Sequence, residues 1–245
     1  MTSPARERRS REHRPWWRGG SSVRSWNGEV LGWAALGLGA GLLAGVGLSL
    51  LVAGIWGTLA LWLALTVPVV VAFRRGVPRG LLVFRLVDVL YAVVLGGAMR
   101  LVQGWIAGPA AFPSYPSLDS SLPPLWWAEE LLAGGVIAPV VEELFFRGVL
   151  LVGVFTVLRR VLRRSRTDGI LPAGVIAVVT TAGLFVLTHQ LVSPLTADAA
   201  LALGLLGLVT GALVVFTGRI WPAVLAHIVF NLSGIGLAVI GTLLG

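Results

Sequence analysis

A chain of 245 residues that is 56% hydrophobic and only 12% charged is too apolar to be a soluble globular domain. Its formal net charge is +8, and most of its arginines lie in the first 28 residues or between apolar runs, a pattern that indicates membrane topology. The absence of cysteine excludes disulfides, a thiol nucleophile and a cysteine metal site.

The first 28 residues are polar and arginine-rich, and glycine and serine interrupt them. Such a composition buries too little apolar surface to fold, so it predicts a disordered tail on the cytoplasmic side. We expect its arginines to contact anionic lipid, and we predict no nucleic-acid partner. Three tryptophans of this tail are predicted anchors at the membrane interface: Trp16, Trp17 and Trp26.

Residues 29–245 form one predicted membrane-embedded domain, with a motif-bearing core over residues 125–235. Apolar runs of about 20 residues recur along it, each long enough to cross a hydrocarbon layer of about 30 Å as a helix. The predicted fold class is an all-α, polytopic transmembrane helix bundle of about seven spans, multi-pass in the cell membrane. The runs cover approximately residues 30–53, 55–73, 81–108, a stretch within 125–164, 170–192, 199–217 and 220–244.

The stretch 125–164 is helical in pattern but too long for one span. Gly134, Gly135 and Pro139 predict a break between a short interfacial helix and the fourth span.

The connections between the spans differ in their arginine content. Those after the second and fourth spans are rich in arginine, whereas residues 109–124 and the loop near Pro194 contain none. The positive-inside rule therefore predicts a cytoplasmic N-terminus and an external C-terminus. Nothing in the sequence indicates an oligomeric state.

Acidic residues inside predicted spans mark pairing or function, because a charge in lipid is costly. Asp88 lies three residues after Arg85, and we expect the two side chains to pair on one helix face. Glu143 and Arg147 are one helical turn apart, which predicts a second ion pair. Glu142, about 100° around the helix, has no such local partner.

An unpaired carboxylate in apolar surroundings holds a proton more readily than one in water, which suits a base for water. The alternative is that Glu142 and Glu143 only anchor the bundle. His189 and His227 also fall within predicted spans, and Asn231 follows His227 by one turn on the same face. A lone buried histidine more often bonds a neighbouring helix, but all these groups together would supply the base and donors for amide hydrolysis.

Three motifs follow one another in this region: Glu-Glu-x-x-x-Arg at 142–147, Phe-x-x-x-His at 185–189 and His-x-x-x-Asn at 227–231. In this order they resemble the CAAX protease and bacteriocin-processing family, over roughly residues 138–233. The resemblance implies an intramembrane endopeptidase, related to type II CAAX prenyl endopeptidases, that cleaves a membrane-associated protein or peptide.

The resemblance also implies roles for six residues: water activation by Glu142 and His189, oxyanion binding by His227 and Asn231, and support of the site by Glu143 and Arg147. It favours a reaction without a metal cofactor. The alternative is a divalent ion such as zinc bound by Glu142, His189 and His227.

Other interpretations compete with proteolysis. A non-catalytic membrane scaffold or immunity factor could keep the same fold, and a proton-coupled transporter could use buried glutamate and histidine. Transporters usually show an internal repeat, and we find no convincing one. A second acidic pair, Glu129 and Glu130, lies beside Trp126 and Trp127, which predicts a position at the membrane interface.

Depth along the spans leaves the direction of substrate access open. At about 1.5 Å per residue, Glu142 and His189 lie about 25 Å from the cytoplasmic ends of their spans, but His227 only about 10 Å. Tilt, a short hairpin between the last two spans, or entry of that hairpin into the membrane could reconcile these depths.

Overall fold

The computed structural model describes residues 14–52, 54–108, 113–115, 121–164 and 169–244. These residues form helices and connections without any strand, and six of the helices are long and apolar enough to cross a membrane. The predicted all-α, multi-pass fold is confirmed. The six helices are α2 (Gly28–Leu51), α3 (Trp56–Arg75), the run α4, η3 and α5 (Leu86–Ala107), α8 (Ile170–Val192), α9 (Ala197–Thr217) and α10 (Trp221–Leu244).

The fourth predicted span lies within one uninterrupted helical run from Trp127 to Arg164. The predicted break at Gly134, Gly135 and Pro139 is wrong, because the chain stays helical through all three residues. The run changes its hydrogen-bond register instead, with π-helical turns before and after a short α-helix, and such turns often occur at functional sites. Its parts are η4 (Trp127–Ile137), α6 (Ala138–Glu143), η5 (Leu144–Leu151) and α7 (Val152–Arg164).

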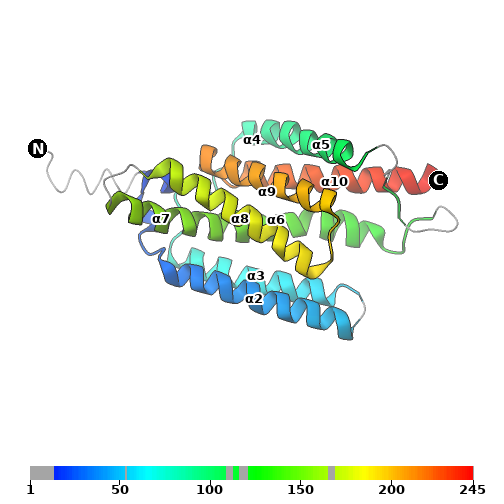
Figure 1. Cartoon of the computed structure of the whole chain (residues 1–245), viewed down its shortest axis with the longest axis horizontal. Helices are drawn as coiled ribbons and strands as arrows, with labels where there is room; N and C mark the ends of the chain where they lie inside the picture. The colour runs from blue at the N-terminus through cyan, green and yellow to red at the C-terminus, as the bar shows by residue number, and fades with distance from the viewer. Residues whose placement is uncertain (1–13, 53, 109–112, 116–120, 165–168, 245) are drawn as a thin grey trace, which may run out of the picture.

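The helices form an elongated bundle in which the run from η4 to α7 is central. The hairpin of α2 and α3 covers one flank of this run, and α4 and α5 lie on the opposite flank beside α10 (Figure 1). Helices α8 and α9 pack against each other along their length. The central run therefore has neighbours from both halves of the chain.

Small residues set the distance between α2 and α3. A methyl group added at Gly37 would lie 2.3 Å from Cγ of Pro68, and one added at Gly41 would lie 2.9 Å from Cβ of Ala64. Both contacts are closer than packed carbon atoms allow, so the two backbones approach each other through these glycines.

The N-terminal segment, defined here as residues 14–28, folds onto one end of the bundle. Where the sequence predicted disorder through residue 28, it forms two short 3₁₀ helices, η1 (Trp16–Arg18) and η2 (Ser21–Val23). Residues 1–13, which hold most of the arginines expected to contact lipid, lie outside the described residues.

Two tryptophans explain why this segment is ordered. Trp16 and Trp26 are 1% and 0% exposed, and each indole N–H donates to a backbone carbonyl at 2.9 Å, of Gly218 and Gly76 respectively. The Trp16 ring also packs edge-on against Phe155. A composition-based prediction of disorder missed these long-range contacts because it counts only local residues.

The predicted pairing of Arg85 with Asp88 takes a different form. The side chain of Asp88, which is fully buried, pairs with Arg219, whose Nε lies 3.1 Å from Oδ1 and whose Nη2 lies 2.5 Å from the same atom. Arg85 contributes its backbone N–H, which donates to Oδ2 of Asp88 at 2.9 Å. The ion pair therefore ties the start of α4 to the connection between α9 and α10.

These contacts gather the arginine-rich connections at one end of the bundle. The N-terminal segment, the end of α3, the C-terminal part of α7 and the α9–α10 connection meet there, whereas the C-terminal end of α10 lies at the opposite end (Figure 1). The segregation of charge that the sequence predicted is therefore present in three dimensions.

Candidate active site

An aromatic cluster brings the central helical run together with α8 and α10. The ring of Phe185 on α8 packs edge-on against Phe146 at 5.3 Å and against His227 at 5.7 Å, measured between ring centroids. It also packs against His189, one turn later on its own helix, at 4.4 Å. Phe185, which is fully buried, thus holds the two imidazoles on one side of α6.

Glu142 lies between the two imidazoles. Its Oε1 is 3.9 Å from Nε2 of His189, and its Oε2 is 3.9 Å from Nε2 of His227. Both separations are too long for a direct hydrogen bond. The Glu142 side chain is 15% exposed and that of His189 is 30% exposed, so this part of the site is accessible to small molecules.

The hydrogen bond of His189 determines which of its nitrogens is available. Its Nδ1 lies 2.9 Å from the backbone oxygen of Phe185, and a carbonyl oxygen can only accept, so Nδ1 carries the hydrogen. In the neutral ring Nε2 is then an acceptor. The nitrogen that faces Glu142 can therefore accept a proton or a hydrogen bond from water.

Glu143 orients the other imidazole. Its Oε1 lies 3.0 Å from Nδ1 of His227 and 2.9 Å from Nη1 of Arg147, and the side chains of Glu143 and Arg147 are fully buried. The predicted ion pair between Glu143 and Arg147 is confirmed. The contact with His227 was not predicted, because it joins residues 84 positions apart and no local spacing signals it.

Arg147 completes its contacts on α9 and α8. Its Nη2 donates to the backbone oxygen of Gly207 at 3.2 Å, and its guanidinium lies 4.7 Å from the centre of the Phe185 ring. A methyl group at Gly207 would come within 3.4 Å of Nη2 and 3.1 Å of Cβ of Ala182. Gly207 thus allows close packing and also gives the buried arginine an acceptor.

Asn231 links α10 to the π-helical part of the central run. Its side-chain nitrogen donates to the backbone oxygen of Gly134 at 3.0 Å. Ala138 N–H reaches back five residues to Ala133, so the next donor in that register would be the nitrogen of Pro139, which carries no hydrogen. Asn231 therefore supplies the hydrogen bond that Pro139 cannot make to Gly134.

The comparison with known protein families identifies this part of the chain. Residues 124–233 match the family described as type II CAAX prenyl endopeptidase Rce1-like. This segment of the chain is therefore similar to the Rce1-like family. It is a protease family, which the resemblance of the motifs predicted, and the matched segment includes all six candidate residues. No curated protein and no solved structure matches the chain.

A cavity opens beside the candidate residues, between the Rce1-like segment and α3. It has a volume of about 220 Å³, and Glu142 and His189 lie on its wall. The opposite wall belongs to α3, whose contributing residues are Thr58, Leu61, Trp62 and Leu65. The first half of the chain, which lies outside the family match, thus completes the surroundings of the candidate site.

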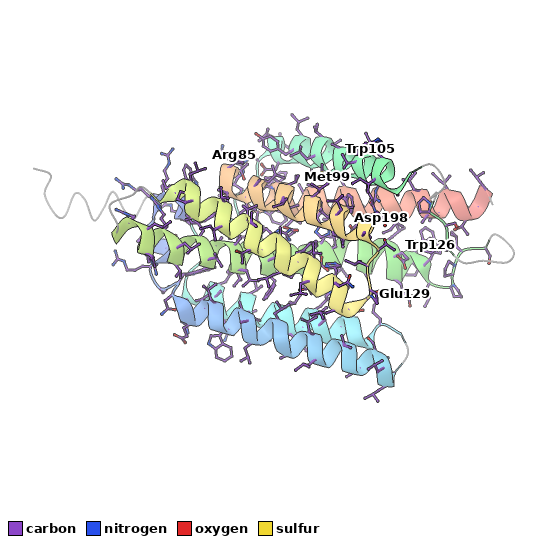
Figure 2. All side chains as sticks on the ribbon, viewed as in Figure 1. Arg85, Met99, Trp105, Trp126, Glu129 and Asp198 are labelled. Carbon is purple, nitrogen blue, oxygen red and sulfur yellow. The ribbon has the colours of Figure 1, made fainter. Side chains whose placement is uncertain are left out.

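A second cavity, of about 310 Å³, continues the first toward the arginine-free end of the bundle. The two share Thr58, Trp62 and Gly134, and the second is also lined by Glu129 and Glu130. Figure 2 shows Glu129 toward the end of the bundle opposite Arg85. The acidic pair that the sequence predicted at the membrane interface therefore lies at the mouth of a path to Glu142.

The sequence places Glu142 and His189 deeper in their spans than His227, but the three side chains lie at one level in the folded chain. Because Trp16 bonds Gly218 and packs on Phe155, the α9–α10 connection is level with Phe155 and not with the end of α7. The last turns of α7 thus extend beyond that connection. Measured from the level of the α9–α10 connection, Glu142 is therefore less deep than its distance from the end of α7 suggests, and it lies beside His227.

The side chains of Glu142, His189 and His227 are not placed at the distances that a shared metal ion requires. Among the described residues, no group of three or more histidine, cysteine, aspartate or glutamate side chains is arranged to hold a metal. Glu142 lies 3.9 Å from each imidazole, whereas donors about 2.1 Å from a tetrahedral zinc are about 3.4 Å apart.

Proposed function

We propose that the protein is an intramembrane endopeptidase that cleaves a membrane-associated protein or peptide with water activated by Glu142 and His189. The observation that carries this proposal is the position of Glu142, whose carboxylate faces Nε2 of both imidazoles at the wall of a cavity. The similarity of residues 124–233 to a protease family supports the same conclusion.

The first step is the attack of water. A water molecule hydrogen-bonded to Glu142 and to Nε2 of His189 gives one proton to the carboxylate while its oxygen bonds to the carbonyl carbon of the substrate. The carbonyl π electrons move to the oxygen and form an oxyanion. Because His189 donates Nδ1–H to a carbonyl, its Nε2 is free to orient this water.

The oxyanion needs hydrogen-bond donors that are already in place. His227 is held by Glu143 through Nδ1, so its Nε2 points into the site and donates when the ring carries both protons. Asn231 uses one amide hydrogen for Gly134 and retains a second. We assign oxyanion binding to these two side chains.

Collapse of the intermediate breaks the carbon–nitrogen bond. The electron pair of that bond goes to the nitrogen, which takes the proton that Glu142 holds and leaves as an amine. The other product is a carboxylic acid, which gives up its proton at neutral pH. Atoms and charge balance with water as the only co-reactant.

The two joined cavities provide a route for the substrate. They lead from Glu129 and Glu130 along α3 to Glu142, and their walls near Glu142 are mostly apolar. An extended peptide fits such a route better than a compact domain. The acidic mouth favours a substrate that carries a basic side chain in the part that lies at the mouth, away from the scissile bond.

The proposal is tested by comparing membrane proteins in cells that contain the active chain with those in cells that contain variants. Glu142→Gln and His189→Ala are each expected to lower cleavage by about a hundredfold or more, while the protein still inserts and folds. Asp198→Asn, at the start of α9, is the matched control and should cleave normally. New protein termini that persist at wild-type levels in either variant would refute the assigned roles.

We also infer that the arginine-rich end of the bundle faces the cytoplasm. The chain has no cysteine, so single-cysteine variants report topology directly. A membrane-impermeant maleimide should label Ser193→Cys on intact cells, and Ser25→Cys only after the membrane is opened. The reverse pattern would place the arginine-rich end outside.

A further inference from the structure

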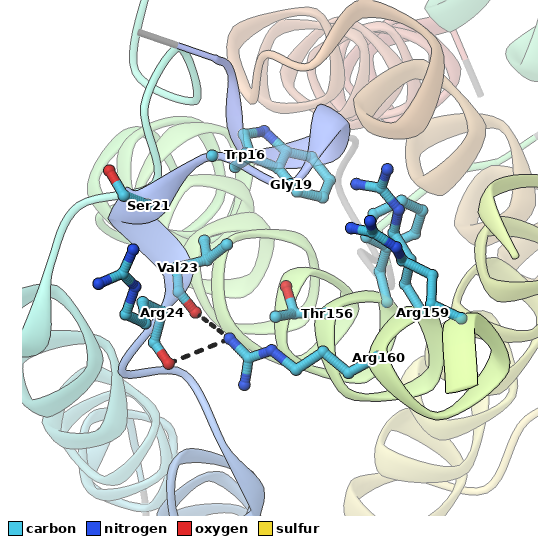
Figure 3. Close-up of a pocket in the computed structure, with 11 residues that line it drawn as sticks. Trp16, Gly19, Ser21, Val23, Arg24, Thr156, Arg159 and Arg160 are labelled. Carbon is cyan, nitrogen blue, oxygen red and sulfur yellow. Dashed lines mark hydrogen bonds between the residues drawn. The ribbon is translucent and has the colours of Figure 1, made fainter. Parts of the chain in front are cut away.

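A separate pocket lies at the arginine-rich end, between the N-terminal segment and α7 (Figure 3). Its volume is about 150 Å³, which has room for one phosphate group, and it shares no lining residue with the cavity beside Glu142. None of the described residues that line it is acidic. Four of them are arginines: Arg24, Arg159, Arg160 and Arg163. The pocket is thus strongly positive.

The contacts of Arg160 leave its charge without a counterion among the described residues. Its guanidinium donates to the backbone oxygens of Trp26, Val23 and Arg24, all of which are neutral (Figure 3 shows the last two). These bonds fix the guanidinium at the wall of the pocket. They hold the charge in place without neutralising it, which is the arrangement that an anion site requires.

Thr156 gives an independent indication of a ligand. It is only 6% exposed, it lines the pocket, and its hydroxyl has no hydrogen-bond partner among the described residues. Other buried threonines in these helices, such as Thr181 and Thr210, bond the carbonyl four residues earlier. Thr156 does not, so an unsatisfied buried donor faces a positively charged hollow.

We propose that this pocket binds a phosphate group, with the Thr156 hydroxyl and the arginines as donors. Phospholipid headgroups supply this chemistry where the bundle meets the membrane surface, and free phosphate compounds supply it in solution. Because its walls come from both the N-terminal segment and α7, a bound phosphate holds these elements together. The ligand therefore stabilises the arginine-rich end of the bundle.

The test measures binding of phosphatidylglycerol to the purified full chain by native mass spectrometry, and its effect on Tm, with phosphatidylcholine as the comparison. The wild type is expected to bind phosphatidylglycerol more tightly and to show a raised Tm. Thr156→Val keeps the shape of the side chain and removes the hydroxyl, so binding should weaken about tenfold, the effect of one hydrogen bond to a charged group.

A charge-matched pair of variants separates the pocket from general attraction. Arg163→Gln should weaken binding, whereas Arg74→Gln, an exposed arginine at the end of α3, should not. Competition by inorganic phosphate would show that the pocket also takes soluble phosphate, and its absence would assign the lipid headgroup. Wild-type binding by Thr156→Val and Arg163→Gln would overturn the proposal.

Discussion

The two sides of α6 hold adjacent carboxylates in opposite situations. On the inner side Glu143 is fully buried and contacts both Arg147 and His227. On the outer side Glu142 makes no direct hydrogen bond in the described structure and borders a cavity. A rotation of about 100° along one helix thus separates a structural carboxylate from one that is free to react.

The largest expected effect is a loss of stability when the buried carboxylate on the inner side of α6 is removed. Glu143→Ala leaves Arg147 buried without its carboxylate, which should destabilise the fold by about 3–5 kcal/mol. Glu142→Ala should change stability by less than about 1 kcal/mol, because no direct partner is lost. Thermal unfolding of both variants in detergent measures the difference.

The double variant Glu143→Gln with Arg147→Met is the control for the inner side. Removing both charges avoids an unpaired buried ion, so it should recover much of the stability that Glu143→Ala loses. If Glu142→Ala and Glu143→Ala destabilise equally, the two sides of α6 do not differ as described.

An intermediate effect concerns the bond between Asn231 and the turn that precedes α6. Asn231→Leu removes the donor to the backbone oxygen of Gly134 and should cost about 1–3 kcal/mol. Pro139→Ala restores a backbone N–H near that oxygen, so the same Asn231→Leu change should cost less in that background. Equal costs in both backgrounds, measured as a double-mutant cycle, would show that Pro139 is not the reason for the bond.

The smallest expected effect is a change in peptide preference on the outer side of α6, where Glu142 borders the cavity. Trp62→Phe reshapes the cavity wall opposite Glu142 and should change the relative kcat/KM of two peptide substrates by about tenfold or less, without a change in Tm. Trp33→Phe, on the exposed surface of α2, is the matched control. A loss of stability in Trp62→Phe without any change in peptide preference would assign Trp62 to packing alone.

The sequence predicted what depends on local spacing. Apolar runs gave the spans, and the interval of four residues gave the ion pair of Glu143 with Arg147. The motifs, through their family resemblance, also led to the residues that meet at Glu142. Roles in catalysis stay predictions until activity is measured.

What the sequence missed depends on contacts between distant residues. Asp88 pairs with Arg219, 131 positions away, and not with the side chain of its neighbour Arg85. Asn231 bonds Gly134 across 97 positions, and the reason lies in a π-helical register that glycine and proline did not reveal. Long-range partners of this kind follow from packing, which no local pattern encodes.

The bond from Trp16 to Gly218 has a consequence for biosynthesis. The two residues are 202 positions apart, so at about 5–20 residues per second the ribosome needs about 10–40 s after Trp16 to reach its acceptor. During that interval the indole N–H lacks its native acceptor, and every helix from α2 to α9 is synthesised first. The earliest part of the chain to be made is therefore among the last to find its place.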